Sequence, residues 1–336
     1  MKLISVVTPC YNEEENAADL YEQVKKIFSE LPQYHYEHIF IDNCSEDKTV
    51  SILKRIAAQD NNVKIIVNTR NFGPVRSPVY GYFQAKGDVV ISIVCDLQDP
   101  PELIKDFLTA WEAGWKIVVA TKAKTQEGFL MARVRKLYYW LANKIANIKL
   151  VKNFTGFGLY DKTVIHAIKE LGDSYPYFRG IISEIGYPIK EIPFLQPLRK
   201  RGASKANFYI LFDWAILGFT SHSKVPIRLA TMLGLFLSVF SLFCAAALFI
   251  LKLIFWNHFY AGIAPIMIAL FFFFSILLFF LGIIGEYVAS IHTQILKRPL
   301  VYVAERINFD KNTDSDIMSE RKNNNEAPAK NHDKIK

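Results

Sequence analysis

One stretch of the chain decides the fold: Val89-Val90-Ile91-Ser92-Ile93-Val94-Cys95-Asp96-Leu97-Gln98-Asp99-Pro100-Pro101-Glu102. It begins as a near-continuous apolar run, which predicts a strand buried on both faces of a sheet. The proline pair then stops the strand, because proline suits the first turn of a helix but not a central ladder. The strand therefore delivers Asp96 to its carboxyl end, where open α/β sheets bind their ligands. An acidic loop that only caps the next helix is the alternative.

The first third of the chain alternates strand and helix patterns. The predicted order is strand 3–7, helix 16–28, strand 38–41, helix 49–58, strand 63–67, helix 75–86 and strand 89–94, with a further strand at 116–120 and a long helix at 131–148. This order predicts an α/β fold with a mainly parallel sheet and right-handed crossovers. No G-x-G-x-x-G follows the first strand and no P-loop motif occurs, so the dinucleotide fingerprint and the P-loop are excluded.

Polar motifs follow four of the predicted strands. They are Thr8-Pro9-Cys10-Tyr11-Asn12-Glu13, Ile41-Asp42-Asn43-Cys44-Ser45-Glu46-Asp47, Asn68-Thr69-Arg70-Asn71-Phe72-Gly73 and Asp96-Leu97-Gln98-Asp99. Because such strand ends meet at one edge of a sheet, we expect a single crevice that suits a nucleotide diphosphate with a divalent cation. We expect Tyr11 to pack on the base, Asp42 to accept from base or ribose, and Arg70 to pair with phosphate. Asp96 would hold the metal.

Two long apolar segments lie in the C-terminal part. Leu229–Leu251 contains no charged residue, and Leu253–Gly285 contains none either, with only His258 as an ionisable side chain. Each reaches the roughly 20 apolar residues that cross a bilayer core of about 30 Å. We therefore expect a hairpin of two transmembrane helices, and two buried core helices are the alternative. Basic residues on the outer flanks place both termini in the cytoplasm.

The strand-end motifs resemble those of the GT-A family of inverting glycosyltransferases, specifically the polyisoprenyl-phosphate glycosyltransferases such as dolichyl-phosphate mannose synthases and bactoprenol glucosyltransferases. The resemblance extends to about Glu305 and is carried by Asn71-Phe72-Gly73, Gly87-Asp88 and the run from Asp96 to Glu102. It implies an enzyme that moves a hexose, glucose above all, from a UDP-sugar to undecaprenyl phosphate for glycosylation of the cell envelope. It also implies Mg²⁺ or Mn²⁺ as cofactor and a homo-oligomer in the inner membrane.

The resemblance assigns residues to each part of such a site. The nucleotide-sugar set is Pro9, Tyr11, Asn12, Glu13, Asp42, Ser45, Asp47, Arg70, Asn71 and Gln98. The segment from Arg199 to Lys205 is similar to the family's Arg-x-x-Gly-x-Ser-Lys stretch, which assigns the acceptor phosphate to Arg199, Arg201, Ser204 and Lys205. The implied catalytic residues are Asp96, Arg199, Arg201 and Lys205. A positive-inside flank is the alternative interpretation of this basic segment.

The chain departs from the family pattern at two acidic positions. Val94 stands where relatives often have the first acid of an Asp-x-Asp pair, so metal binding would depend on Asp96, with help from Gln98 or Asp99. The family's Gly-Asp-Phe-Arg-Leu segment is replaced by Thr155–Asp161, which lacks its acid and its arginine. A lipid phosphate is already anionic and can attack without a base, so this loss is compatible with transfer. Glu184 is a reserve acid or base, with a solvated helix-end charge as the alternative.

The expected organisation follows from these segments. It comprises a cytoplasmic catalytic domain at 1–206, an interfacial amphipathic helix region at 207–228, the transmembrane hairpin at 229–287, a cytoplasmic C-terminal segment at 288–306 and a disordered polar tail at 307–336. The net charge of +8 favours membrane phosphates over nucleic acid as partner, because basic residues gather before the first apolar segment. The four cysteines lack C-x-x-C spacing, so neither zinc nor a disulfide framework is expected.

Two other functions stay open, and a third lacks its sequence features. The donor could be GDP-mannose. A polysaccharide synthase would need more membrane spans and a Gln-x-x-Arg-Trp motif, and the sequence has neither. A catalytically inactive membrane scaffold of the same fold is the alternative from another class, because two acids of the family pattern are missing.

Overall fold

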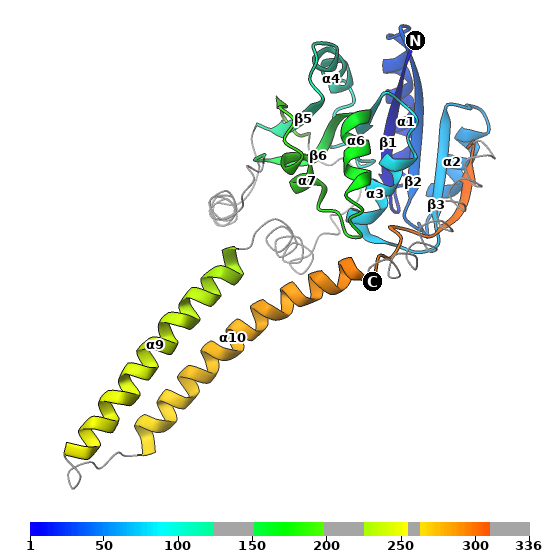
Figure 1. Cartoon of the computed structure of the whole chain (residues 1–336). Helices are drawn as coiled ribbons and strands as arrows, with labels where there is room; N and C mark the ends of the chain where they lie inside the picture. The colour runs from blue at the N-terminus through cyan, green and yellow to red at the C-terminus, as the bar shows by residue number, and fades with distance from the viewer. Residues whose placement is uncertain (124–150, 198–224, 255–262, 310–336) are drawn as a thin grey trace, which may run out of the picture.

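The structure is a computed structural model that describes residues 1–123, 151–197, 225–254 and 263–309. Figure 1 shows an α/β domain from which a pair of long helices extends. The strands are β1 (Lys2–Cys10), β2 (Tyr34–Asp42), β3 (Val63–Asn68), β4 (Val89–Ser92), β5 (Ile117–Lys122), β6 (Phe154–Asp161), β7 (Ile189–Phe194) and β8 (Val303–Ile307). The helices are α1 (Ala17–Ser29), α2 (Thr49–Ala57), α3 (Gly73–Gln84), α4 (Leu103–Glu112), α6 (Lys162–Glu170), α7 (Phe178–Glu184), α9 (Val225–Ile254) and α10 (Ile263–Ile295).

The strands form one 8-stranded sheet in the order β7-β5-β6-β4-β1-β2-β3-β8. β1 pairs in parallel with β2 and β4, β2 with β3, and β5 with β7. β6 runs antiparallel between β4 and β5, and β8 runs antiparallel along β3. The predicted α/β fold with a mainly parallel sheet is therefore confirmed. β6, β7 and β8 lie outside the predicted strands.

The sheet is buried on both faces by helices, which explains the apolar runs of its central strands. One core cluster joins the sheet to α1, α2 and α4 through residues such as Leu20, Leu53 and Phe107. The other joins it to α3, α6 and α7 through residues such as Val79 and Ile182. Every residue of β4 is buried, as the opening stretch predicts, but the strand ends at Ser92, two positions before the predicted end.

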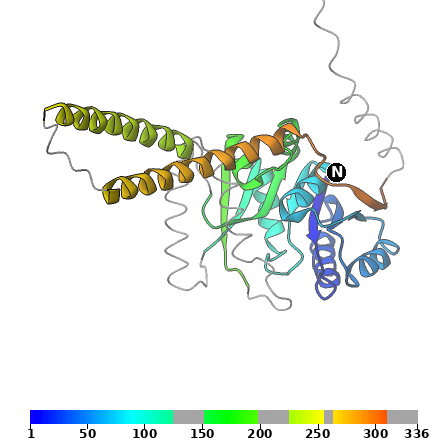
Figure 2. The ribbon, with the colours of Figure 1, turned by 90° about the horizontal axis from the view of Figure 1, so that it is seen from below.

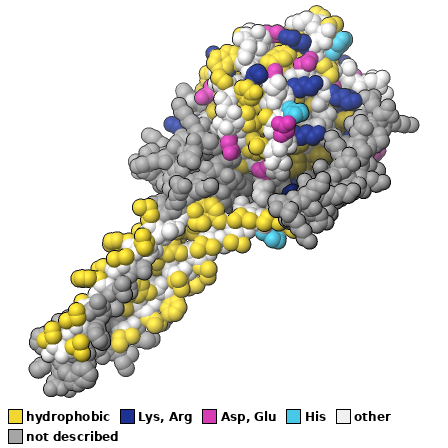
Figure 3. Space-filling model, in the orientation of Figure 1, with side chains coloured by type: hydrophobic (Ala, Val, Ile, Leu, Met, Phe, Trp, Pro, Cys, Tyr) yellow, Lys and Arg dark blue, Asp and Glu magenta, His cyan; other side chains and the backbone are white. Residues whose placement is uncertain are grey.

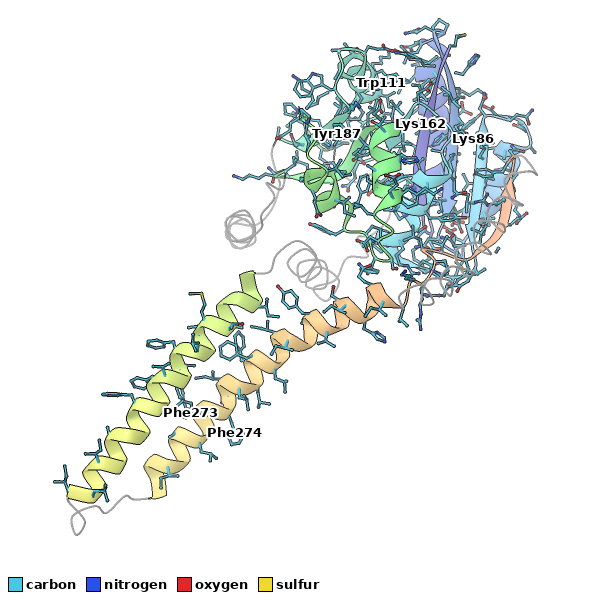
Figure 4. The ribbon with its side chains drawn as sticks, in the orientation of Figure 1. Lys86, Trp111, Lys162, Tyr187, Phe273 and Phe274 are labelled. Atoms are coloured by element: carbon cyan, nitrogen blue, oxygen red, sulfur yellow. The ribbon has the colours of Figure 1, made fainter. Side chains whose placement is uncertain are left out.

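The two long helices cover most of the two predicted apolar segments. Among the described residues, one helix is long and apolar enough to cross a membrane, and its candidate span is Phe272–Ile295 in α10, with 24 residues and a mean hydropathy of 2.1. Hydrophobic side chains cover this part of the molecule in Figure 3, and Figure 4 places Phe273 and Phe274 far from the α/β domain. The predicted helix at 131–148 and nearly all of the interfacial region lie outside the described residues.

The chain returns to the sheet after α10, as Figure 2 shows from below. β8 forms the edge next to β3, and the backbone N–H of Thr69 donates to the carbonyl of Tyr302 at 2.9 Å. Asn308 donates to the carbonyls of Ala57 and Val63, both at 2.8 Å. Ordered structure thus continues past residue 306, so the predicted start of the polar tail at 307 is too early.

Candidate active site

A cavity of about 600 Å³ opens at the carboxyl ends of the central strands. Its lining comes from the ends of β1 and β4 and the residues that follow them, from the residues after β2 and β3, from much of α3, from the start of β6 and from the segment that leads into α7. The lining includes Pro9 from the predicted set, and the lining residues used below are Cys10, Tyr11, Glu13, Asn71, Val94, Cys95, Asp96, Thr155, Gly156, Pro176, Tyr177 and Arg179. The strand-end motifs predicted to meet therefore contribute to one cavity.

The loops after β1 and β2 are tied together by side chains. The backbone N–H of Asn12 donates to Oγ of Ser45 at 2.8 Å, and the backbone N–H of Glu13 donates to Oγ1 of Thr49 at 2.8 Å. In return, Oδ1 of Asn12 accepts the N–H of Glu46 at 2.8 Å. These bonds hold Glu13 in the cavity wall at a defined place, because both loops would have to move together.

Asp42 holds Ser45, and through it the two joined loops, in place. Its side chain is fully buried, and its two oxygens accept the backbone N–H and the hydroxyl of Ser45 at 2.9 and 2.5 Å. Burial raises the pKa of the Asp42 carboxyl, and the hydrogen bonds from Ser45 lower it in part. Asp42 is absent from the cavity lining, so its predicted contact with base or ribose stays a prediction.

The loop after β3 is organised by two amides. Asn43 donates to Oδ1 of Asn71 at 2.8 Å, and its own Oδ1 accepts the backbone N–H of Phe72 at 2.9 Å. Gly73 adopts φ +84, a left-handed conformation that suits glycine, and this turn starts α3. Asn71 lines the cavity, whereas Arg70 is exposed with its guanidinium 4.2 Å from the centre of the Phe72 ring. The predicted pairing of Arg70 with phosphate stays a prediction.

Asp96 lies in the cavity wall just beyond β4. Its Oδ1 accepts the backbone N–H of Gln98 at 3.1 Å. Val94, at the position of the missing acid, is 36% exposed and lies in the same wall. Within the described ranges no group of three or more His, Cys, Asp or Glu side chains could hold a metal. One carboxylate still fits Mg²⁺, which commonly binds one or two carboxylates, substrate phosphates and water.

The wall next to Asp96 is formed by β6, which pairs with β4, and by α7. Arg179, in the first turn of α7, donates to the backbone carbonyl of Thr155 at 3.0 Å. The hydroxyl of Thr155 is buried and has no hydrogen-bond partner in the described part of the chain. Gly156 has φ +110, and a Cβ placed on it would meet nothing within 4 Å. This wall therefore offers a guanidinium, an unsatisfied hydroxyl and free space.

Comparison with known proteins gives the family. Residues 5–168 match the sequence model of the family described as Glycosyl transferase family 2. The chain is 34% identical over 297 residues to the SfII prophage-derived bactoprenol glucosyl transferase of Shigella flexneri. The aligned region covers 88% of this chain and 96% of that protein. The chain belongs to glycosyl transferase family 2. It is therefore a glycosyltransferase with a GT-A fold.

Two further relatives span nearly the whole enzyme. An uncharacterized glycosyltransferase of Synechocystis sp. is 34% identical over 303 residues, covering 90% of this chain and 95% of its own. The prophage bactoprenol glucosyl transferase homolog of Escherichia coli is 32% identical over 305 residues, covering 90% and 99%. Among solved structures, S. aureus TarS 1-349 in complex with UDP-GlcNAc covers 67% of this chain and 68% of its own, with 16% identity and a TM-score of 0.42. That value is too low for a comparison of individual residues.

The second acid of the opening stretch has an unusual environment in this glycosyltransferase. Asp99 is 2% exposed, and its one hydrogen bond from a described residue comes from the backbone N–H of Val94 at 3.4 Å. Burial raises the pKa of Asp99 to about 7, and the nearby charge of Asp96 adds to the rise. Asp99 is absent from the cavity lining. Its expected help with metal binding is therefore not supported by its position.

The enzyme also places two thiols at the floor of the cavity. Cys10 and Cys95 are both 2% exposed and follow neighbouring strands. The hydrogen bond with Cys95, together with burial, raises the pKa of the Cys10 thiol well above its ordinary value. A thiol in this state is a poor nucleophile.

The remaining predicted residues fall into three groups. Asn12, Ser45 and Asp47 stand behind the lining and hold loops in place through hydrogen bonds, while Gln98 lies beside Asp96 outside the lining. Glu184 is exposed at the end of α7 and absent from the lining. Arg199, Arg201, Ser204 and Lys205 lie outside the described residues. Sequence reasoning missed Arg179, because a single arginine in an irregular segment carries no motif.

Proposed function

We propose that this glycosyltransferase moves a hexose, in the first place glucose, from a UDP-sugar to undecaprenyl phosphate with inversion at the sugar's anomeric carbon. The observation that carries the proposal is the 34% identity over nearly the full length to a protein named as a bactoprenol glucosyl transferase. The cavity supports it, because the strand-end loops that resemble a nucleotide-sugar site share one space with Asp96 and Arg179. GDP-mannose is the alternative donor.

The proposed transfer requires no general base. A phosphate oxygen of the lipid attacks the anomeric carbon, and the bond from that carbon to the β-phosphate oxygen breaks. UDP leaves with the electron pair, and the lipid phosphate becomes a phosphodiester that has one negative charge fewer. Gly156 stands where relatives have an acid, which suits an acceptor that arrives already ionised. The remaining task of the protein is to position two anions and stabilise the leaving diphosphate.

We further propose that Asp96 holds Mg²⁺ or Mn²⁺ together with the donor diphosphate. A bound divalent ion would neutralise charge that develops on the departing UDP. The protein positions the Asp96 carboxylate, because the backbone N–H of Gln98 donates a hydrogen bond to it. The side chains of Tyr11 and Glu13, in the same wall region, would contact the nucleotide.

The membrane arrangement completes the proposal. α9 and α10 would form a transmembrane hairpin with both termini in the cytoplasm, and the interfacial region at 207–228 would lead into it. The domain at 1–206 would then work at the cytoplasmic leaflet of the inner membrane, with the segment at 288–306 beside it. The residues after β8 would form the polar tail. We also propose a homo-oligomer, as the family resemblance implies.

The test is transfer of labelled sugar to undecaprenyl phosphate by the full-length enzyme. With UDP-glucose, UDP-galactose, UDP-N-acetylglucosamine and GDP-mannose as separate donors, we expect UDP-glucose to give the highest kcat/KM. Asp96→Asn should lower that value by about 100-fold or more, because the leaving diphosphate loses its main stabilising group. Asp106→Asn, at an exposed position on α4, is the matched control and should behave as wild type.

Three results would count against this function. Normal activity of Asp96→Asn would remove the metal assignment. Faster transfer from GDP-mannose would replace the donor. Tight UDP binding without turnover of any donor would favour the inactive scaffold.

A further inference from the structure

Arg179 is the one lysine or arginine among the described residues that line the cavity. The carboxylates of Glu13 and Asp96 lie in the same lining. A reaction between a sugar diphosphate and a lipid phosphate brings two more anions into this space. Such a site needs positive charge at each anion, because like charges at close range repel strongly in a partly buried environment.

The guanidinium of Arg179 is held in place but keeps most of its donors. Its hydrogen bond to the carbonyl of Thr155, at 3.0 Å, is the only one that a described residue provides. No described carboxylate forms an ion pair with it. An arginine has five N–H donors in a planar fork that matches a phosphate, so several donors are available for a ligand.

The neighbouring turn adds to the same wall. The buried hydroxyl of Thr155 lacks a partner within the described residues, and buried polar groups in native proteins almost always have one. Gly156, the next residue, leaves open space where a side chain would project. The wall has a cation, an unsatisfied hydroxyl and room for a tetrahedral group, which together fit a phosphate.

This wall is connected to the helix that carries the candidate membrane span. The backbone N–H of Ser174 donates to Oε1 of Gln294 at 3.3 Å, and Nε2 of Gln294 donates to Asp173 at 2.6 Å. Gln294 belongs to the last turn of α10, inside Phe272–Ile295. Pro176, Tyr177 and Arg179, which line the cavity, follow Ser174 closely in the sequence. A phosphate on a membrane lipid would therefore arrive beside this wall.

We propose that Arg179 and the Thr155–Gly156 turn form a subsite for the phosphate monoester of the lipid acceptor, in the same cavity as Asp96. The inference rests on the proposed transfer function. Arg179 binds the acceptor phosphate through its guanidinium fork and aligns one oxygen toward the sugar. The donor diphosphate is left to Asp96 with its divalent ion. The basic segment that contains Arg199 and Lys205 is a separate prediction and is not needed for this subsite.

The experiment compares Arg179→Gln, Arg179→Lys and the exposed control Arg55→Gln in the full-length enzyme. Initial rates are measured against undecaprenyl phosphate at saturating UDP-glucose and against UDP-glucose at saturating lipid, and UDP binding is measured by calorimetry. Arg179→Gln should raise the KM for the lipid by about 10- to 100-fold, because a charged hydrogen-bonding group is lost. The KM for the donor and the Kd for UDP should stay within about twofold of wild type, since donor contacts are intact.

A competition assay identifies the group that is recognised. Geranyl phosphate should inhibit the wild type in competition with the lipid, and Arg179→Gln should lose most of that inhibition. Geraniol, which lacks the phosphate, should inhibit neither. Equal inhibition by inorganic phosphate would show that the phosphate alone is bound and that the lipid chain adds nothing. Arg179→Lys should recover part of the affinity, because it keeps the charge but not the fork.

Several outcomes would overturn the subsite. An unchanged KM for the lipid would do so, as would a matching loss of UDP affinity, which would place Arg179 on the donor diphosphate. A fall in kcat with both KM values unchanged would indicate a structural role, and Arg179→Lys behaving like Arg179→Gln in thermal stability would point the same way. Absence of transfer by the wild type with every donor would instead contradict the proposed function itself.

Discussion

At one end of the cavity, the loops after β1 and β2 are joined by hydrogen bonds of 2.8 Å through Asn12, Ser45 and Thr49. At the other end, β6 and α7 contribute the unsatisfied hydroxyl of Thr155 and a guanidinium with one described hydrogen bond. The first end is organised before any ligand arrives. The second leaves polar groups for a ligand to satisfy. If the first end binds the nucleotide sugar and the second the lipid phosphate, as proposed, this difference would favour binding of the nucleotide sugar before the lipid.

Two buried carboxylates, Asp42 and Asp99, differ in the same way in how many hydrogen bonds they accept. Asp42, at the end of β2, accepts two hydrogen bonds from Ser45 at 2.9 and 2.5 Å. Asp99 accepts only a long one, 3.4 Å from the N–H of Val94, among the described residues. Burial raises the pKa of both carboxyls, and that of Asp99 reaches about 7. Hydrogen bonding therefore decides how well each buried charge is tolerated.

The largest effect is expected for Asp99→Asn, and it depends on pH. The pKa of Asp99 is about 7 in the folded protein, against an ordinary value of 3.8, so the folded state binds more protons between these values. The stability that this group contributes is complete below pH 4 and is lost as the pH rises through 7. Asn keeps an acceptor without the charge, so the variant should exceed wild type in stability by about 4 kcal/mol at pH 8, an upper estimate from roughly three pKa units.

The measurement is the thermal midpoint of the full-length protein in EDTA from pH 4 to pH 8. The advantage of Asp99→Asn should grow steadily across that range, whereas Asp106→Asn should show no trend. A difference between Asp99→Asn and wild type that is constant with pH would contradict the raised pKa.

A somewhat smaller effect is expected for Asp42→Ala. The substitution leaves the N–H and hydroxyl of the partly buried Ser45 without their acceptor, which should lower the free energy of unfolding by about 2–3 kcal/mol. The Kd for UDP should rise about tenfold, because Ser45 in turn holds the loop of Asn12 and Glu13. Denaturant titration and calorimetry with UDP measure the two quantities. Unchanged UDP affinity in a folded variant would separate this network from the donor site, and Asp106→Ala serves as the matched control.

The smallest effects come from removing one hydroxyl at each end of the cavity. Ser45→Ala should lower the free energy of unfolding by about 1–2 kcal/mol, because it breaks bonds to Asn12 and Asp42. Thr155→Val, which keeps the shape of the side chain, should leave the free energy unchanged or raise it by up to about 1 kcal/mol, because the lost hydroxyl has no described partner. Denaturant unfolding of both variants measures the difference in sign. Equal destabilisation by the two substitutions would show that the ends are built alike.

The sequence predicted the loops after β1 and β2 better than the wall formed by β6 and α7, for physical reasons. β1 to β4 are parallel strands buried on both faces, so they appear as apolar runs that end in polar motifs. β6 is an antiparallel strand that contains Gly156 and Gly158, and a Cβ on Gly158 would come within 2.5 Å of the carbonyl of Val118. A strand that requires glycine for close approach lacks the usual strand signal. Arg179 is near Thr155 only through tertiary packing.

The sequence analysis also did not predict β8, the C-terminal edge strand of the sheet. β8 pairs with β3 although α9 and α10 lie between them in the chain. Its sequence, Val303–Ile307, is short and contains two adjacent charges, so no local pattern identifies it as a strand. The contact between Gln294 and Asp173 is likewise long-range. Local patterns cannot report such pairings.

β8 also imposes an order on the synthesis of the protein. Chains emerge from the ribosome with the N-terminus first, so β3 is made long before the strand that covers its edge. Until α9 and α10 have been synthesised, the outer edge of β3 has unpaired backbone groups, and such edges recruit other strands. The sheet of this enzyme is therefore completed last, after both long apolar helices have been synthesised.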